Sequence, residues 1–208
     1  MYQTRQETTT KLPIPRKGTK YIARALSHHK NSVPVVIAVR DMLKMAKTAN
    51  EVKKMIRANL LKINGRIVKD YRESIKLFNI LEADKHYVLT LLPTRKFALE
   101  ETKDKDARVC KVINKKLLKS NTIQINLHDG SNILTKDKIK VGDSIYIDFS
   151  NKIKKHLSFE KGKEVFIMSG KYSGLKGKVE NIEGHKVSVK FAKGEGEAQL
   201  TESQLIII

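Results

Sequence analysis

Residues 48–70 read TANEVKKMIRANLLKINGRIVKD, and this stretch decides the fold of the first part of the chain. Thr48 and Glu51 have the spacing of a capping box, in which the Thr hydroxyl accepts a hydrogen bond from an amide one turn into the helix and the Glu side chain reaches back. The helix that follows gathers apolar side chains on one face: Val52, Met55, Ile56 and Leu60. Its other face carries three positive charges: Lys53, Lys54 and Arg57. The pattern predicts an amphipathic helix with a compact basic surface.

The same stretch continues into a predicted hairpin. Asn64 and Gly65 stand between two short runs in which apolar and basic residues alternate. Asn-Gly is a strong hairpin signal because both residues tolerate positive φ. Arg66 and Lys69 add charge to the second run. A basic helix followed by a basic hairpin has a shape suited to a phosphate backbone. The turn alone explains Asn64 and Gly65, and a close approach of a polyanion to this backbone stays open.

The composition points to the same kind of partner. The chain has 208 residues, with 42 Lys and Arg against 22 Asp and Glu, and a formal net charge of +20. Such a charge repels itself in the free protein and is neutralised when a polyanion binds. We therefore expect a nucleic acid as the partner. With 33 Lys against 9 Arg, most of the attraction should be non-specific, because Lys acts as a point charge.

Other classes of protein fit the sequence less well. Cys110 is the single cysteine, so an intrachain disulfide and a cysteine-based zinc site are excluded. No apolar run approaches the ~20 residues that span a bilayer, and the first residues lack the apolar core of a secretory signal. We expect no membrane partner, no metal, no cofactor and a cytoplasmic location.

Shifts in composition predict four parts: residues 1–30, 31–84, 85–157 and 158–208. The first part is polar, and Pro13, Pro15 and Gly18 interrupt regular structure. We interpret it as an extended basic arm with four cations: Arg16, Lys17, Lys20 and Arg24. The alternative is a terminus that is disordered in the free protein. Such arms commonly become ordered as they bind a polyanion.

The second part reads as a small helical module. Ser32 is a good helix N-cap and Pro34 is tolerated in a first turn. Apolar residues from Val35 to Ala46 then recur with helical spacing. The more exposed side of this helix carries three cations: Arg40, Lys44 and Lys47. Together with the Thr48-capped helix, this pattern predicts a helix–turn–helix unit. The hairpin lies behind the two helices, and residues 71–81 complete the module.

From His86 the period changes to that of short strands rich in Val, Ile and Leu, which is typical of a small antiparallel β-domain. The predicted strands are residues 86–93, 109–113, 123–127, 131–134 and 141–149. Asp129-Gly130 is a hairpin turn, and Ile145, Ile147 and Phe149 should point inward. Residues 102–108 are predicted to be a solvated loop and residues 155–160 a linker.

The last part predicts a compact five-stranded barrel. Four of its strands are expected at residues 165–168, 178–182, 186–191 and 205–208. Three glycines mark the turn after the first of these strands: Gly170, Gly174 and Gly177. They do not form a phosphate-binding P-loop, because Lys178 is followed by Val179 where that motif has Ser or Thr.

No group of residues supports catalysis. His28 and His29 are adjacent, so their side chains point apart, and no cysteine or acidic residue stands nearby to share a metal. Cys110 is interpreted as a small buried hydrophobe. His128 and Asp129 lie in a hairpin turn with no Ser or Cys placed for activation.

The order of these parts resembles a known family. Residues 40–70 resemble the RNA-binding motif named after bacterial small-subunit ribosomal protein four. Residues 161–183 resemble a KOW motif with Gly170 as its central glycine. Four strings carry the likeness: PIPRK (13–17), VRDMLKMAKTANEVKK (39–54), INLHDGSNIL (125–134) and FEKGKEVFIMSGKYSGLKGKV (159–179). Over residues 11–183 the chain resembles the archaeal and eukaryotic-type small-subunit ribosomal protein four family (S-four-e), and a compact archaeal member fits best.

The resemblance implies an α+β fold of several modules: an S-four-like RNA-binding domain, a central antiparallel β-domain and a C-terminal SH3-like KOW barrel. It implies a structural, non-catalytic constituent of the small ribosomal subunit, with small-subunit rRNA and neighbouring ribosomal proteins as partners and no small-molecule substrate. Carried over by position, the RNA face comprises Arg40, Lys44, Lys47, Lys53, Lys54, Arg57, Asn64, Gly65, Arg66 and Lys69.

Two other interpretations stay open. The helical module also accompanies RNA-modifying enzymes, although the rest of the chain lacks a glycine-rich cofactor loop and an obvious catalytic Asp. A KOW barrel also suits a non-ribosomal RNA-binding protein or a transcription factor. A solvated face is the ordinary meaning of a charge run, but acidic partners are almost absent between Val52 and Gly65.

Overall fold

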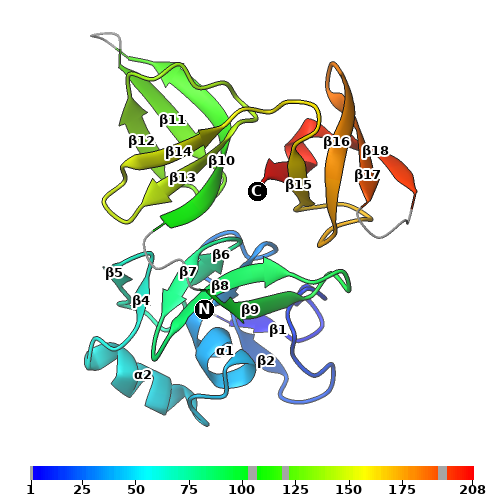
Figure 1. Ribbon diagram of the computed structural model, residues 1–208. Coiled ribbons are helices and arrows are strands. Elements are labelled where there is room, and N and C mark those ends of the chain that lie inside the picture. Colours follow the sequence, from blue (N-terminus) through cyan, green and yellow to red (C-terminus); the bar gives the residue numbers. More distant parts are fainter. Residues whose placement is uncertain (1, 103–106, 119–121, 192–195) are drawn as a thin grey trace. The chain divides into compact units, whose positions relative to one another are not determined.

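The computed structural model describes residues 2–102, 107–118, 122–191 and 196–208. The chain divides into two compact units, residues 1–105 and 106–208. Strands dominate both units, and the described residues contain two short α-helices, α1 (Val35–Ile37) and α2 (Ala49–Arg57). Figure 1 shows both helices in the first unit.

Helix α2 forms as its capping signal predicts. The Glu51 amide donates to the Thr48 hydroxyl at 3.3 Å, and the Glu51 carboxylate accepts from the Lys47 amide at 2.7 Å. Val52 and Ile56 are buried on the inner face. The prediction is wrong for Leu60, which lies beyond the helix and is 58% exposed. Asn59 turns the chain there with a φ of +55°.

The predicted helix after Ser32 is shorter than its spacing suggested. Ser32 lies in a strand, β3 (Ser32–Pro34), that pairs with β6 (Ser74–Lys76), and its hydroxyl donates to the carbonyls of Ser27 and His28 instead of capping a helix. Helix α1 continues into one wide π-helical turn, η1 (Ala38–Met42), in which the Leu43 amide bonds the Ala38 carbonyl at 2.9 Å. Lys44 ends this turn with a φ of +57°.

A five-stranded sheet forms the centre of the first unit, in the order β5-β4-β7-β8-β9. These strands are β4 (Lys62–Ile63), β5 (Arg66–Ile67), β7 (Ile80–Glu82), β8 (His86–Leu91) and β9 (Phe97–Glu101). The predicted boundary after residue 84 is therefore wrong, because β8 pairs with β7 and belongs to this unit. Short strands such as β4 and β5 need these longer neighbours, since an isolated two-stranded hairpin is marginally stable.

Residues 2–30 are not an extended arm. Strands β1 (Tyr2–Thr4) and β2 (Tyr21–Ala23) pair antiparallel and form a ribbon. Leu12, Ile22 and Ala25 are buried, and the Phe97 amide donates to the Lys11 carbonyl at 2.8 Å. The apolar side chains that this segment buries explain why it folds with the module, which the polar composition concealed.

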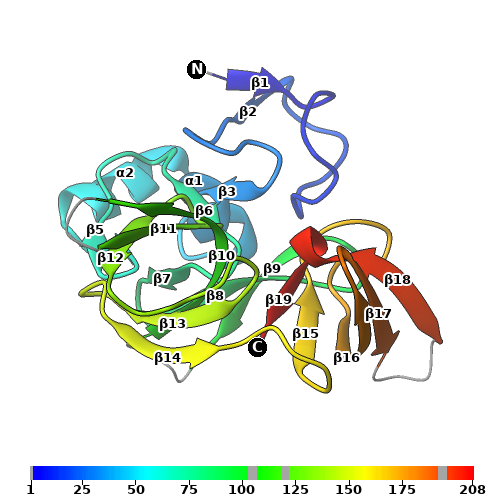
Figure 2. The ribbon, with the colours of Figure 1, turned by 90° about the horizontal axis from the view of Figure 1, so that it is seen from above.

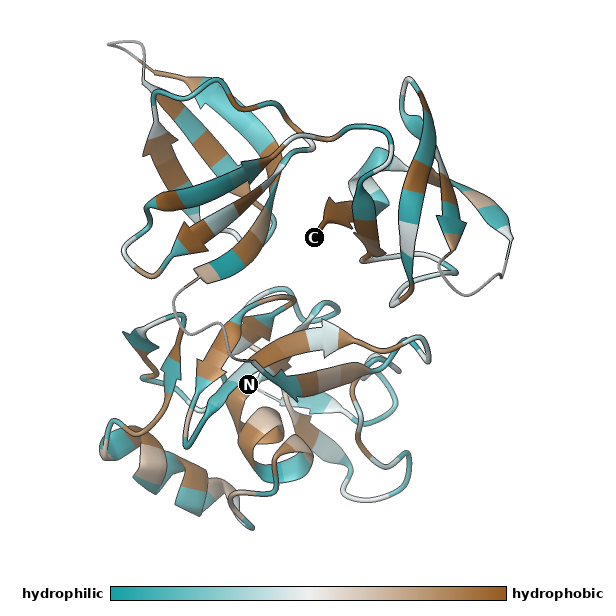
Figure 3. Ribbon diagram, in the orientation of Figure 1, coloured by the Kyte–Doolittle hydropathy of each residue, from teal (hydrophilic) through white to brown (hydrophobic). Residues whose placement is uncertain are grey.

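The described residues of the second unit form two sheets, and Figure 2 shows each of them curved. The first has the order β12-β11-β10-β13-β14. Its strands are β10 (Ala107–Leu117), β11 (Ile123–Leu127), β12 (Asn132–Thr135), β13 (Ser144–Asp148) and β14 (Ile153–Leu157). Ile145 and Ile147 are fully buried, as predicted, whereas Phe149 lies beyond β13 and is half-buried. Figure 3 shows the alternation of hydrophobic and hydrophilic residues along these strands.

Two predicted connections flank this sheet. The linker at residues 155–160 is wrong in its first half, because Lys155 and Leu157 belong to β14, which pairs with β13. The solvated loop at residues 102–108 falls mostly on residues 103–106, which lie outside the described residues. Ala107 already belongs to β10.

The second sheet has the order β18-β17-β16-β15-β19. Its strands are β15 (Glu164–Ile167), β16 (Lys176–Glu183), β17 (Lys186–Phe191), β18 (Glu197–Thr201) and β19 (Leu205–Ile207). Strand β18 is an addition to the predicted set. Among the described residues no pairing joins β18 to β19, so five strands are present as predicted but closure of the barrel is not established.

Gly177 is not a turn glycine. It lies inside β16, where a Cβ atom would meet the Lys190 carbonyl oxygen and a Val189 methyl group at 2.6 Å each. Gly170 and Gly174 do lie in the turn, with φ values of +95° and +92°. The close approach of β17, not a turn, therefore requires glycine at position 177.

Candidate nucleic-acid interface

The outer face of α2 carries the clearest basic surface of the first unit. Lys54 and Arg57 are exposed, and neither side chain has an ion-pair partner among the described residues. Lys53 differs, because it is half-buried and its Nζ lies 4.8 Å from the centroid of the Tyr71 ring. Lys54 and Arg57 stand one turn apart, so they present two uncompensated charges side by side.

The β4–β5 hairpin begins five residues after α2 ends, and Figure 1 shows the two elements at the same end of the first unit. Asn64 and Gly65 have φ values of +52° and +76°, as an Asn-Gly turn requires. The Gly65 amide donates to Glu82 at 2.9 Å, and Asn64 Oδ1 accepts from the Ile80 amide at 2.8 Å. These polar groups attach the hairpin to β7, so they are engaged within the fold.

The two basic residues of the hairpin region have different surroundings. Arg66 forms an ion pair with Glu73 at 2.8 Å, yet its own side chain remains 70% exposed. Glu73 is largely buried and also accepts from the Lys69 amide at 2.8 Å. The Lys69 side chain is exposed. Arg66 thus offers a charge that Glu73 partly neutralises, and Lys69 offers one beside it.

The predicted cations between the helices are less uniform than the sequence suggests. Arg40 forms a two-pronged ion pair with Asp41, at 2.9 and 2.8 Å, and is half-buried. Lys44 and Lys47 are exposed in the turn before α2. Arg40 is therefore already paired, whereas the two lysines extend the charged surface of α2 along the chain.

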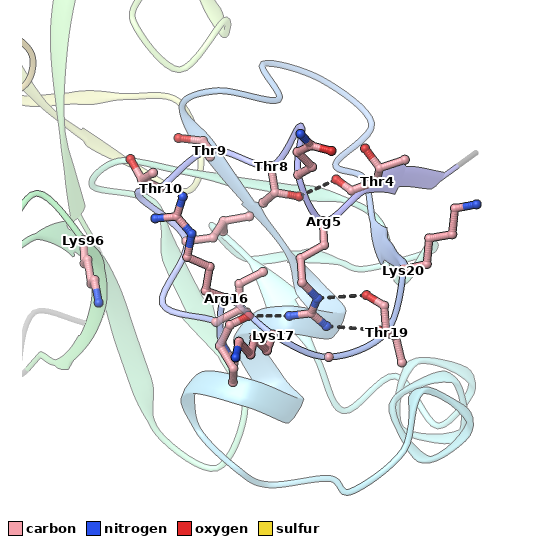
Figure 4. A pocket seen from close by; sticks show the side chains of 15 residues that line it. Thr4, Arg5, Thr8, Thr9, Thr10, Arg16, Lys17, Thr19, Lys20 and Lys96 are labelled. Atoms are coloured by element: carbon pink, nitrogen blue, oxygen red, sulfur yellow. Dashed lines mark hydrogen bonds between the residues drawn. The ribbon is translucent and has the colours of Figure 1, made fainter.

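The N-terminal cations border a cavity of about 770 Å³. Arg16, Lys17 and Lys20 are exposed and line it, together with Lys96 from the β8–β9 turn. Figure 4 shows Arg5 reaching across this loop to Thr19. Its guanidinium donates to the Thr19 carbonyl at 2.8 Å, to the Thr19 hydroxyl at 3.1 Å and to the Pro15 carbonyl. Arg24, also predicted, is half-buried and does not line this cavity.

A second, smaller cavity of about 280 Å³ contains residues that the sequence did not single out. Tyr2, Tyr21 and Tyr71 line it, together with Arg40 and Lys53. Burial, followed by the hydrogen bond to Tyr2, raises the pKa of the Tyr71 hydroxyl. The available signal was the interleaving of aromatic and basic residues in Lys20-Tyr21 and Tyr71-Arg72. No spacing along the chain joins the three tyrosines.

The structure therefore gathers the predicted cations of the first unit into distinct groups. Lys53 and Arg40 meet at the tyrosine-lined cavity. Arg16, Lys17 and Lys20 meet at the larger cavity. Lys54 and Arg57 stand on the open face of α2. The KOW glycines Gly170, Gly174 and Gly177 belong to the second unit, where they shape β16 and the turn before it.

Family models match three regions of the chain. The S4 domain matches residues 38–78, the ribosomal family S4e matches residues 83–153, and the KOW motif matches residues 161–190. The S4e match extends across the boundary between the two compact units. No helix among the described residues is long and apolar enough to cross a membrane.

Curated relatives extend the match over most of the chain. The small ribosomal subunit protein eS4 of Methanocella arvoryzae is 30% identical over 94% of this chain and 88% of its own length. The eS4 protein of Methanocaldococcus jannaschii is 34% identical over 82% of this chain and 76% of its own length. The crystal structure of the 30S ribosomal protein S4e from Thermoplasma acidophilum has a TM-score of 0.72 at 23% identity, and the match covers 86% of this chain and 95% of that one. The chain belongs to the S4e family of ribosomal proteins.

Proposed function

We propose that this chain is a structural constituent of the small ribosomal subunit and binds rRNA through the basic surface of its first unit. The observation that carries the proposal is the pair of exposed, uncompensated cations Lys54 and Arg57 on α2, inside the region that the S4 domain matches. Lys44, Lys47 and Lys69 extend this surface. The relatives named as small ribosomal subunit proteins support the assignment to that subunit.

The mechanism is the release of counterions combined with matching of shape. Double-stranded RNA displays phosphates and 2′-hydroxyls across a wide minor groove, and its major groove is too narrow for side chains to read. Lys54 supplies a mobile point charge, while Arg57 can bind a phosphate through two parallel hydrogen bonds. A helix that carries both groups recognises the position of phosphates without reading the base sequence of the RNA.

The finer features of the proposal concern partners, location and the last module. We infer a non-catalytic protein in the cytoplasmic ribosome, with neighbouring ribosomal proteins as further partners and no cofactor. We also infer that residues 158–208 form an SH3-like barrel. The support for the barrel is the five-strand order together with the short 3-10 turn η3 (Glu202–Gln204), which connects β18 directly to β19.

A double variant tests the basic surface. Lys54→Ala with Arg57→Ala should weaken binding to a small-subunit rRNA transcript and should flatten the slope of log K against log salt by about 1 for each lost phosphate contact. Binding is measured by filter retention at a series of salt concentrations. Both residues are exposed, so the melting curve should match that of the parent protein.

The charge-matched control is Lys85→Ala with Lys138→Ala. Lys85 already pairs with Glu101 at 2.9 Å, and Lys138 is exposed in the second unit. This variant loses the same formal charge as Lys54→Ala with Arg57→Ala. If the position of the charge matters, it should lower the affinity for RNA much less. Equal losses in the two variants would show that net charge alone drives binding and would overturn the assignment of the site to α2.

A further inference from the structure

We propose that Tyr2, Tyr21 and Tyr71 form a stacking site for one unpaired nucleobase of the RNA partner. This inference rests on the proposed function and names a ligand for a site outside the outer face of α2. It gives the N-terminal ribbon a role in recognising single-stranded RNA, in addition to the attraction of phosphates.

The ribbon presents two tyrosines on one face. In the β1–β2 register Tyr2 lies opposite Ala23, and Thr4 lies opposite Tyr21, so these four side chains share a face. Tyr2 is 65% exposed and Tyr21 is 56% exposed. Large aromatic rings contribute strongly to binding when they are covered. Two of them left open on a small ribbon indicate a surface that a partner covers.

Cations adjoin the rings. The Nζ of Lys20 lies 5.4 Å from the centroid of the Tyr21 ring. Lys53 Nζ and Arg72 Cζ lie 4.8 and 5.4 Å from the centroid of the Tyr71 ring. Cations at these distances are attracted to the ring faces. They also place positive charge where the phosphates on either side of a stacked base would run.

The cavity between the rings has the size and lining of a site for one small planar group. Its volume of about 280 Å³ lies just below the usual range of small-molecule sites, roughly 300–1,000 Å³. Ile22, Ala23 and Val36 contribute apolar lining. Asp41 is the carboxylate among the lining residues, and Arg40 holds it in a two-pronged ion pair. An anionic chain is therefore not repelled by an unpaired acid.

The larger cavity adjoins the smaller one and complements it. Arg5, Pro15 and Thr19 line both, so they form a shared wall. The hydrogen bonds of Arg5 to Pro15 and Thr19 occupy its guanidinium and hold this wall in place. The larger cavity is also lined by Thr8, Thr9 and Thr10, which carry hydroxyl groups, and by the cations Lys17 and Lys20. Hydroxyls and lysines suit a sugar-phosphate backbone, as the tyrosines suit a base.

The chemistry of both cavities favours single-stranded RNA over a duplex. Aromatic side chains that bind RNA stack on the unpaired bases of single-stranded loops, bulges and ends. Such stacking tolerates any sequence because every base has a π-face. Bases in a continuous duplex are stacked on each other and cannot enter a cavity between tyrosine rings.

The test uses a single-stranded RNA of about ten nucleotides with 2-aminopurine at its centre, and the same strand annealed to its complement. The fluorescence of the free strand should fall when the parent protein binds, because the base stacks on a ring. Tyr21→Ala should weaken binding of the single strand by roughly 5- to 150-fold and should abolish the quenching. Tyr21→Phe should keep the parent's affinity for the single strand and the quenching, because it retains the ring.

Two controls make the result specific. Tyr87→Ala removes a tyrosine of β8 that lines neither cavity and whose hydroxyl donates to Asp84 at 3.0 Å. This variant should leave the quenching intact. Binding of the duplex should be unchanged by Tyr21→Ala. Equal weakening for both RNAs, or unaltered quenching, would overturn the stacking site while leaving salt-dependent RNA binding in place. A failure of the parent protein to bind any RNA would overturn the proposed function as well.

Discussion

Cys110 illustrates how one residue is governed by its surroundings. It is fully buried in the core of the sheet of β10–β14. Next to it Arg108 and Asp129 form a buried ion pair at 3.1 Å, and Ser131 donates to the same Asp129 carboxylate. Burial, and then the charge of Asp129, raises the pKa of the Cys110 thiol to about 12. The thiolate, which is the reactive form, is therefore almost absent at neutral pH.

We accordingly expect Cys110 to resist alkylation in the folded protein. At pH 8 a maleimide should label it several orders of magnitude more slowly than it labels the chain in urea, and the measurement is the mass increase over time. Since Cys110 is the single cysteine, the mass reports this site alone. Rapid labelling without denaturant would contradict the burial of Cys110 and with it the core assigned to this sheet.

At the scale of elements, Lys111 connects the two sheets of the second unit. Its buried ammonium donates to the backbone carbonyls of Glu202 and Leu205, the latter at 2.7 Å. The Ile207 amide adds a bond to the Ser144 hydroxyl at 2.9 Å. These contacts attach β19 and η3 to β10 and β13. They explain why the central and C-terminal parts, expected as separate domains, form one compact unit.

This connection predicts a dependence of stability on pH. Burial lowers the pKa of Lys111 from 10.5 to about 8, although the charge of Glu202 partly opposes this. Below pH 8 the folded and unfolded chains both hold the proton, so the cost of burying the charge is fully present. Between pH 8 and 10.5 the folded chain loses the proton first, and Lys111 should add up to about 1.4 kcal/mol of stability per pH unit.

The measurement is urea unfolding of the parent protein and of Lys111→Met at pH 7.5 and pH 10. The free energy of unfolding of the parent minus that of Lys111→Met should be larger at pH 10 than at pH 7.5. Groups that titrate in both proteins cancel in this difference. Lys116→Met, which changes an exposed lysine of the same strand, should show no such shift. A pH-independent difference for Lys111→Met would contradict a lowered pKa.

The elements differ in how far they could be predicted from the sequence. The cap at Thr48 and the turn at Asn64 were predictable, because their signals lie within a few residues and act on the local backbone. Gly177 was misread as a turn glycine, since the close approach of β17 that requires it comes from residues about twelve positions away. Strand pairing likewise moved β8 into the first unit, which no local pattern encodes.

The candidate site shows the same limit. The charges of Lys54 and Arg57 could be predicted as exposed because no acidic residue lies between Val52 and Gly65. The pairing of Arg66 with Glu73 could not, because it depends on the path of the chain after the hairpin. The tyrosine-lined cavity was missed for the same reason: Tyr2, Tyr21 and Tyr71 meet only once the ribbon has folded against the module.

At the scale of the whole molecule, a net charge of +20 is spread over two units that each have their own core. Such a chain is expected to be most stable when an anionic partner neutralises it. The first unit offers exposed cations and exposed tyrosine rings. The second unit contains the KOW region, and hydrogen bonds of Lys111 and Ser144 join the two sheets of this unit. Both observations agree with a protein that works as part of a large RNA assembly.

The most direct test is the quantity of this protein in purified small ribosomal subunits. Cell extract is sedimented through a sucrose gradient at physiological salt, and the chain is quantified by mass spectrometry against the other subunit proteins. The account predicts about one copy per small subunit, with little protein in the lighter fractions. A chain that is absent from that fraction, or that sediments alone or with RNA polymerase, would contradict it.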